Sequence, residues 1–326
     1  MVDNINIKTN NRELVSRIKR NLTSANSSNI KMRGNDLFHI YNNQSDCDSS
    51  HLRVSFDSRF GVSCVISGSI RKWYYGQCSI KDISRCDMPK VFQLLAQNLS
   101  IKLEELCPFT VSRIEIGLNF SSKHDGSLIK SLAVKYINAS YKIGDYENYR
   151  CFSSKSRNNT LKIYDKGQEI KSKIGLITNE AEDKFLKEYS TANITRVELQ
   201  YSGGNKKVSK LSKLSTVGDL ISRYCLLTVS FDKAIKKLTF KNIPTLNYTP
   251  IKGTRKELKD FIFLCGMDAL GDVRINDCIS KIQKRYKSGT KTAIASKRRS
   301  DIKQNVEGNY LLRVMRTRNR ELVIGC

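Results

Sequence analysis

Short segments in which apolar and polar side chains alternate are the feature that most constrains the fold of this chain. Residues 111–120, 161–166 and 194–201 each show this pattern. Successive side chains of a strand point to opposite faces, so each segment predicts a strand with one apolar and one polar face. Sheets of this kind are typically antiparallel. Segments with helical spacing, such as residues 87–99, occur between them. We therefore predict an α+β fold with a mainly antiparallel central sheet flanked by helices.

The polar faces of two of these strands carry the same short arrangement, an arginine, an apolar residue and a glutamate. The first strand contains Arg113 and Glu115, and the last contains Arg196 and Glu198. In each pair the two residues are two positions apart, so both side chains point to the same side of the sheet.

The middle strand offers a different set on one face, namely Lys162, Tyr164 and Lys166. If the three polar faces align, two carboxylates, a phenol and several cations converge. Carboxylate oxygens are suitable ligands for Mg²⁺ or Mn²⁺. A tyrosine oxygen can attack phosphorus, and cations can balance the charge of a phosphate. The alternative is an ordinary antiparallel sheet whose solvated face is crossed by Arg–Glu pairs, and the pattern alone leaves both interpretations open.

The charge of the chain favours a polyanionic partner. Its 326 residues contain 57 Lys and Arg against 31 Asp and Glu, a formal net charge of +26. A hydrophobic content of 39% is too high for a wholly disordered chain. Nucleic acid is the simplest partner for such a surface. A basic stretch near the C-terminus, which includes Lys297, Arg298 and Arg299, adds candidate contacts to phosphate.

At these strands the sequence resembles the replication initiators of filamentous phages and the related X-family phage replication proteins. These are distantly similar to the plasmid Rep proteins that start rolling-circle replication. The motifs that carry the resemblance are SRIE at 112–115, LKIYDKGQE at 161–169 and TRVE at 195–198. Their order and spacing match the family, and the likeness spans roughly residues 52–240.

The resemblance implies a Rep nuclease-like fold and a metal-dependent enzyme that cuts one DNA strand at an origin. Tyr164 would be the nucleophile, forming a 5′-phosphotyrosyl link and freeing a 3′-hydroxyl, so that the protein is both endonuclease and strand transferase. Glu115 and Glu198 would bind Mg²⁺ or Mn²⁺, and Lys166 would assist at the phosphate. Three further cations would contact phosphate or DNA: Arg113, Arg196 and Lys162.

Two features depart from related rolling-circle enzymes. The family strand usually carries Asp where this chain has Glu115. The His-hydrophobic-His metal motif is absent, because His39, His51 and His124 are isolated in the sequence.

These observations predict an organisation in three parts. Residues 1–50 would form an N-terminal arm and loop, residues 51–245 a Rep-like nicking domain, and residues 246–326 a basic helical module that binds DNA. The expected partners are origin DNA and host replication proteins such as helicase and polymerase, in the cytoplasm of a bacterial host and without a membrane. Two alternatives stay open: a relaxase or transposase-like nickase, and a non-enzymatic DNA-binding protein. Participation of a second tyrosine is also open.

Overall fold

A computed structural model describes residues 1–25, 28–42, 50–57, 62–76, 79–137, 141–172, 187, 189, 193–240 and 306–324. Its strands are β1 (Val2–Thr9), β2 (Ile30–Gly34), β3 (Leu37–Tyr41), β4 (His51–Asp57), β5 (Ser63–Ser69), β6 (Thr110–Ser121), β7 (Ala133–Tyr136), β8 (Lys142–Asp145), β9 (Tyr149–Ser153), β10 (Asn159–Asp165), β11 (Ile194–Tyr201) and β12 (Leu238–Phe240). Its helices are α1 (Arg12–Ser24), α2 (Ile70–Tyr75), α3 (Asp87–Asn98), α4 (Leu103–Leu106), α5 (Gly126–Leu132), α6 (Lys166–Lys171), α8 (Asn205–Ser212), α9 (Val217–Ser222), α10 (Tyr224–Ile235) and α13 (Val306–Ile324).

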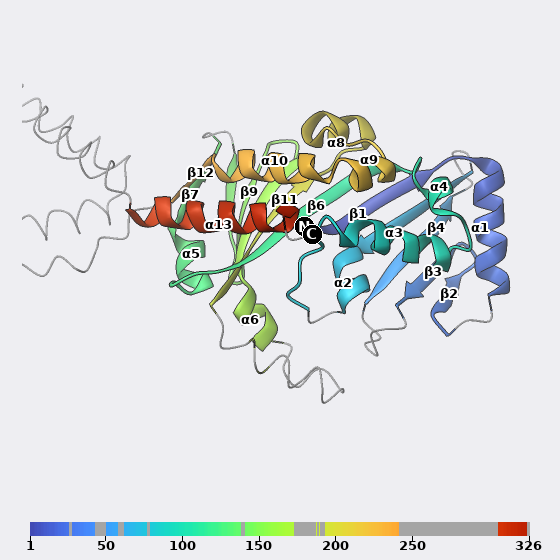
Figure 1. Ribbon diagram of the computed structural model, residues 1–326, viewed down its shortest axis with the longest axis horizontal. Helices are drawn as coiled ribbons and strands as arrows, with labels where there is room; N and C mark the ends of the chain where they lie inside the picture. Colours follow the sequence, from blue (N-terminus) through green and yellow to red (C-terminus); the bar gives the residue numbers. More distant parts are fainter. Residues whose placement is uncertain are drawn as a thin grey trace, which may run out of the picture. The chain divides into compact units, whose positions relative to one another are not determined.

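One ten-stranded sheet organises these elements (Figure 1). Its strand order is β2-β3-β4-β5-β1-β6-β11-β10-β9-β8, and each neighbouring pair is antiparallel. A two-stranded sheet of β12 and β7 completes the described strands. The predicted α+β fold with an antiparallel central sheet flanked by helices is therefore confirmed.

The two halves of the large sheet repeat one topology. In each half the first strand pairs with the last, β1 with β5 and β6 with β11, and a helix follows the first strand. The strand order β2-β3-β4-β5-β1 of one half therefore corresponds to the order β8-β9-β10-β11-β6 of the other. Strand β7 is not part of this comparison, because it pairs with β12 in the small sheet. The halves meet where β1 pairs with β6, so the first strand of the chain lies at the centre of the sheet.

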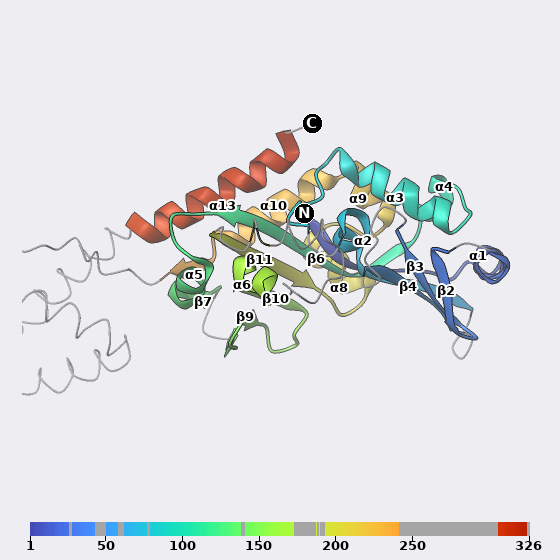
Figure 2. The ribbon, with the colours of Figure 1, turned by 90° about the horizontal axis from the view of Figure 1, so that it is seen from below.

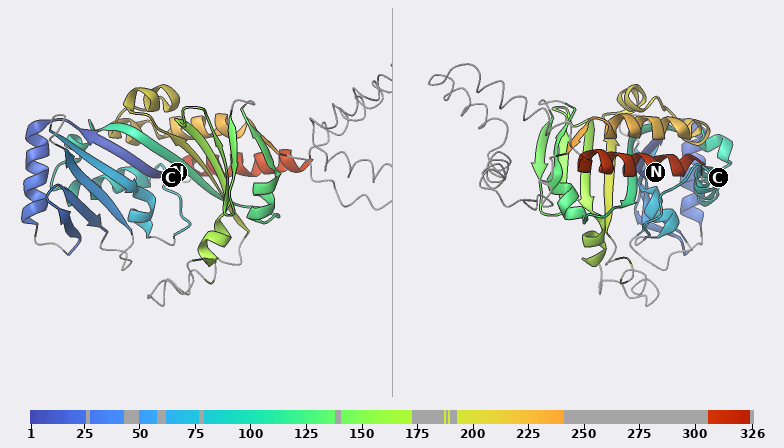
Figure 3. Two further views of the ribbon diagram at one scale, coloured as in Figure 1. Left: turned by 180° about the vertical axis from the view of Figure 1, so that it is seen from behind. Right: turned by 60° about the vertical axis from the view of Figure 1, so that its left-hand side comes forward.

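Helices cover the apolar face of the sheet. Helix α8 packs on β6 and β11, and α10 packs on α8 and α9. Figure 2 shows α10 and α13 lying along one side of the sheet, and Figure 3 (left), seen from behind, shows the strands on the near side. Within this layer, the Nδ2 of Asn319 on α13 donates to the carbonyl of Thr228 on α10 at 2.9 Å.

The N-terminal residues form part of the sheet, which corrects the prediction of an arm and loop over residues 1–50. Strand β1 buries Ile5 and Ile7 between β5 and β6. Helix α1 follows, and its N-cap residue Asn11 accepts a hydrogen bond from the backbone N–H of Leu14 at 3.1 Å. The asparagines of β1, Asn4 and Asn6, lie opposite Ser69 and Ser67 and point to the polar face of the sheet.

The end of the chain also differs from the predicted division at residue 245. From Leu312 onward, α13 belongs to the same compact unit as Met1–Thr239. It is held there by burial of Met315 and Leu322 and by an ion pair from Arg316 to Asp232 at 2.7 Å. The basic residues Lys297, Arg298 and Arg299 lie outside the described residues.

Candidate active site

The three strands with polar faces are neighbours in the sheet, in the order β6-β11-β10. Their register places Glu198 directly between Lys162 and Gly117, and Arg196 directly between Tyr164 and Asn119. Residues opposite each other in an antiparallel pair share a face. The convergence that the alternation left open is therefore present in the structure.

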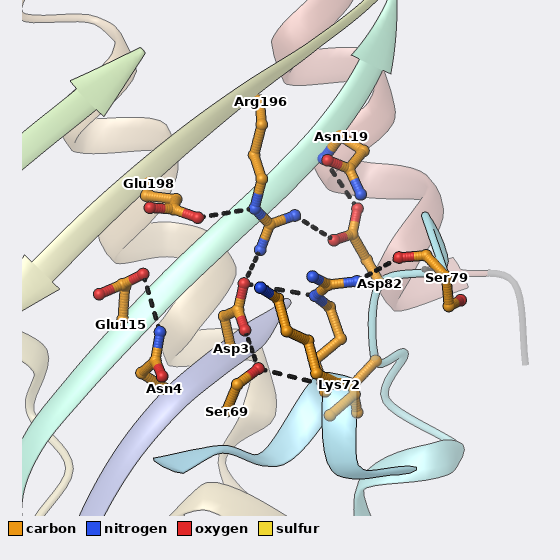
Figure 4. Close-up of polar contacts among 12 residues, drawn as sticks. Asp3, Asn4, Ser69, Lys72, Ser79, Asp82, Glu115, Asn119, Arg196 and Glu198 are labelled. Atoms are coloured by element: carbon orange, nitrogen blue, oxygen red, sulfur yellow. Dashed lines mark hydrogen bonds and ion pairs between the residues drawn. The ribbon is translucent and has the colours of Figure 1, made fainter. Parts of the chain in front are cut away.

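Three carboxylates gather on this face. One oxygen from each of Asp3, Glu115 and Glu198 lies within 4.8 Å of the others, and all three residues are buried. Figure 4 shows the side chains side by side in front of β6 and β11, with Asp3 coming from β1. Sequence reasoning identified the two glutamates and missed Asp3.

The reason that Asp3 was missed is an irregularity in β1. Strict alternation would put Asp3 on the same face as Ile5 and Ile7, which are core residues. The pairing of β1 with β6 shifts register between Val2 and Ile5. A bulge of this kind re-aims a side chain, and here Asp3 turns to the polar face. An acid preceding alternating Asn and Ile residues was a visible signal, but no local pattern in the sequence marks the bulge.

Arg196 organises the buried part of the cluster. Its side chain is 0% exposed, and each of its three nitrogens donates to a different carboxylate. The Nε–Glu198 Oε1 distance is 2.8 Å, the Nη1–Asp82 Oδ1 distance is 3.1 Å, and Nη2 donates to Asp3. Arg196 was predicted to contact DNA phosphate. The structure corrects this role, because its donors are already committed to acids inside the protein.

The backbone of β6 leaves room for this guanidinium. Gly117 lies opposite Glu198, and a Cβ atom at this position would collide with Arg196 Nη2. A residue with a side chain would therefore displace the guanidinium, because the two groups would occupy the same space. Glycine at 117 and arginine at 196 form a matched pair.

Asp3 is neutralised more completely than the other acids. It accepts from Arg196, from Arg71 Nε at 3.3 Å and from the Ser69 hydroxyl. Burial acts to raise the pKa of Asp3, but the two guanidiniums and the hydroxyl outweigh it and hold that pKa well below its usual range. Asp3 is thus a carboxylate fixed in its charged form. We call Asp3, Asp82, Arg71 and Arg196 the guanidinium core.

Asp82, the last member of this core, ties the cluster to the segment between α2 and α3. Its Oδ2 accepts the backbone N–H of Asn119 at 2.9 Å, and the Asn119 side chain donates to the carbonyl of Ile80 at 2.6 Å. Arg71 donates to the carbonyl of Ser79 at 2.5 Å. These contacts satisfy buried polar groups and fix the loop against β6.

Glu115 is in the opposite electrostatic situation. It is 3% exposed, and its neighbours are the Asn4 amide at 3.1 Å and the exposed Arg113 guanidinium at 3.6 Å. Burial and the nearby Glu198 carboxylate raise the pKa of Glu115 to about 7. Two carboxylates this close together repel each other, and a divalent cation between them would relieve that repulsion.

Tyr164 lies at the edge of the same cluster. Its hydroxyl donates to Glu198 Oε1 at 2.8 Å, the same oxygen that accepts from Arg196. Burial and the Glu198 carboxylate raise the pKa of Tyr164 well above its usual value. The phenol is therefore neutral at neutral pH, and it is oriented toward a carboxylate that can accept its proton.

The two lysines of this segment occupy different surroundings. Lys162 is partly exposed, with its ammonium 3.9 Å from Glu198 Oε2. Lys166 is not in the strand, because Asp165 caps helix α6 and Lys166 is its first residue. Its side chain is 1% exposed, and Nζ donates to Glu169 Oε2 at 2.6 Å. Burial lowers the pKa of Lys166 to about 8, against the opposing effect of Glu169.

We call Glu115, Glu198, Tyr164 and Lys162 the reactive edge. The donor set fits a hard divalent cation, since it consists of carboxylate oxygens from three strands and Glu115 is paired, among the residues that the structure describes, only with the exposed Arg113. Glu115 and Glu198 are suited to hold such an ion. The Asp3 oxygens already accept hydrogen bonds from two arginines and a serine. Asp3 is therefore less suited than the two glutamates to bind an ion.

Comparison with known proteins identifies the family of the chain. Residues 2–218 match the family model of the N-terminal region of a phage replication-associated protein, the phage CRI family. The chain belongs to this family of phage replication-associated proteins. The match includes β1, and with it Asp3, as well as the three strands of the cluster. A search of curated proteins finds no match.

Membership of this family identifies the chain as a phage replication initiator and implies that it binds DNA. Within the described part of the chain, none of the helices combines the length and the apolarity needed to cross a bilayer.

Proposed function

We propose that this protein starts rolling-circle replication of a phage genome by nicking one DNA strand and linking itself to the new 5′ end. The observation that carries the proposal is the hydrogen bond from Tyr164 to Glu198, inside a cluster of three buried carboxylates. It brings a nucleophile, a proton acceptor and candidate metal ligands together on one polar face.

In the proposed reaction the Tyr164 oxygen attacks the phosphorus of a DNA phosphodiester. The phenolic proton passes to Glu198, the bond from phosphorus to the 3′ oxygen breaks, and the 3′ oxygen leaves as a hydroxyl after taking up a proton from water. The DNA 5′ phosphate is then joined to tyrosine. Attack of a 3′-hydroxyl on this link reverses the step and transfers the strand.

A divalent cation such as Mg²⁺ or Mn²⁺, when bound by Glu115 and Glu198, supplies polarisation of a phosphate oxygen. Lys162 and Arg113 face the same edge and are exposed enough to balance phosphate charge. Lys166 is held by Glu169 directly after β10, and its buried positive charge lies close enough to Arg71 and Arg196 to be felt by them. In this proposal Lys166 assists at the phosphate through its charge. We expect the protein to act in the bacterial cytoplasm on origin DNA, with a host helicase and polymerase extending the free 3′ end.

The test is a covalent adduct assay with a supercoiled plasmid that carries the cognate origin, in the presence of Mg²⁺. The wild-type chain should yield a protein–DNA adduct that survives denaturation, and Tyr164→Phe should yield none while binding the plasmid normally. A matched control is Tyr149→Phe. Tyr149 is the residue directly opposite Tyr164 on β9, so it presents the same chemical group to the same face.

Retention of the adduct by Tyr164→Phe would exclude Tyr164 as the nucleophile. Loss of the adduct in Tyr149→Phe alone would move the assignment to the neighbouring strand. Absence of any adduct from the wild-type chain, together with tight DNA binding, would favour a DNA-binding protein without this chemistry.

A further inference from the structure

A row of paired residues crosses the polar face of the sheet from its β2 edge to the reactive edge. Each member lies directly opposite the next on the neighbouring strand, so all of them point to the same side of the sheet. This cross-sheet row consists of Lys31, His39, Arg53, Ser67, Asn6 and Arg113.

The row ends beside the carboxylates. Arg113 lies 3.6 Å from Glu115 and donates to Gln200 Oε1 at 3.1 Å. Five steps between strands of ~4.8 Å each separate Lys31 from Arg113, roughly 24 Å in total. A strand of DNA held along the row would therefore lead into the site of cleavage.

Three aromatic side chains lie beside the basic residues at the β3–β4 end of the row. The rings of His39 and His51 stack with centroids 3.9 Å apart and an interplanar angle of 13°. The Tyr41 ring lies 5.3 Å from His51, and the Lys31 ammonium lies 4.8 Å from the Tyr41 centroid. The two histidines, isolated in the sequence, are brought together by the pairing of β3 with β4.

The positive charge here comes from lysine and arginine, and the imidazoles act as neutral rings. Burial lowers the pKa of His39 and His51, and nearby Arg33 lowers both further. Lys31, Arg33 and Arg53 are exposed. Asp57 shares the same face at the end of β4, beyond Arg53 and Ser55 on that strand.

We propose that this surface of β2, β3 and β4 binds single-stranded DNA and guides it along the cross-sheet row to the reactive edge. The proposal rests on the proposed function and names the part of the substrate that occupies this surface. Unpaired bases stack on aromatic side chains, whereas the bases of a duplex are already stacked on one another. Lysine and arginine beside the rings supply phosphate contacts that are independent of sequence.

The test measures binding of a 20-nucleotide oligo-dT and of a 20-base-pair duplex to the full chain by fluorescence anisotropy, without divalent metal so that no cleavage occurs. Tyr41→Leu removes a ring without changing charge, and the double variant Lys31→Gln/Arg53→Gln removes two charges. The matched control is Lys206→Gln/Lys207→Gln, which removes two exposed charges from helix α8 in the layer on the other face. Thermal unfolding of each variant shows that it is folded.

Tyr41→Leu should weaken oligo-dT binding about five-fold or more, and leave duplex binding within about two-fold. The double variant should weaken oligo-dT binding and reduce its salt slope by about 1.4, the value for two lost phosphate contacts. The control should keep the wild-type preference for single strands.

Unchanged oligo-dT binding in folded Tyr41→Leu and in the double variant would overturn the proposal. Equal losses for oligo-dT and duplex would also overturn it, in favour of a duplex-binding surface. These results are separate from the assignment of the nucleophile. The wild-type chain can form the adduct even if this surface does not bind oligo-dT, and the surface can bind oligo-dT even if the chain forms no adduct.

Discussion

The guanidinium core and the reactive edge lie next to each other on one face of the sheet, yet their acids are held in opposite ways. Asp3 receives two guanidiniums and a hydroxyl, and its pKa is depressed. Glu115 is equally buried but faces another carboxylate, and its pKa is raised to about 7. Similar burial with different partners produces these opposite shifts. The acids of the core are paired with buried guanidiniums, whereas Glu115 is paired, in the described ranges of the chain, only with the exposed Arg113.

The largest effect that this comparison predicts is on folding, at Arg196. Arg196→Met should lower the free energy of unfolding by about 3–5 kcal/mol, because it leaves Asp3 and Asp82 buried without their shared partner. Chemical denaturation of the metal-free chain measures this loss. The control is Arg223→Met, which removes a largely exposed arginine 3.6 Å from Asp219 and should cost less than about 1 kcal/mol. Equal, small losses in the two variants would show that the core contributes little to stability.

A smaller effect of the opposite sign is expected at Glu115. Its pKa is raised from about 4.5 in an unfolded chain to about 7 in the folded one, so the folded state resists ionisation of this group. The destabilisation is absent well below pH 4, grows as pH rises, and is complete above pH ~7. Glu115→Gln removes it, so the variant should become more stable than wild type by roughly 1–3 kcal/mol at pH 8 and by less at pH 5.

Urea denaturation in the presence of EDTA at the two pH values measures this difference. Glu104→Gln, at an exposed position on α4, controls for the loss of one negative charge. A stability difference between Glu115→Gln and wild type that is flat from pH 5 to pH 8, or that decreases, would contradict the raised pKa of Glu115.

The same contrast explains what could be predicted from the sequence. Alternation in three strands was enough to place Glu115, Glu198 and Tyr164 on polar faces, because a period of two fixes the face of each residue. Alignment of the three faces depended on the strand order, which brings the Tyr164 hydroxyl to Glu198, 34 positions further along the chain. Chain-distant pairing of this kind leaves no local pattern.

The guanidinium core was largely beyond the reach of the sequence. Asp3 is turned by a bulge, and Arg71 and Asp82 come from a short helix and a loop whose positions depend on tertiary packing. Arg196 was found as a charged strand residue, but its full burial depends on Gly117 of the neighbouring strand, which leaves room for its guanidinium. Burial, and therefore the difference between an arginine that binds phosphate and one that holds the fold together, was not visible in the alternation.

Mn²⁺ binding to the reactive edge, measured by isothermal titration calorimetry at pH 8, tests most directly whether Glu115 is a metal ligand. Wild type and Glu104→Gln should bind one ion with equal affinity, whereas Glu115→Gln should bind at least about ten-fold more weakly while staying folded. Undiminished Mn²⁺ binding by folded Glu115→Gln would contradict the proposal that Glu115 is a metal ligand. It would also contradict the proposal that the reactive edge, unlike the guanidinium core, binds a cation.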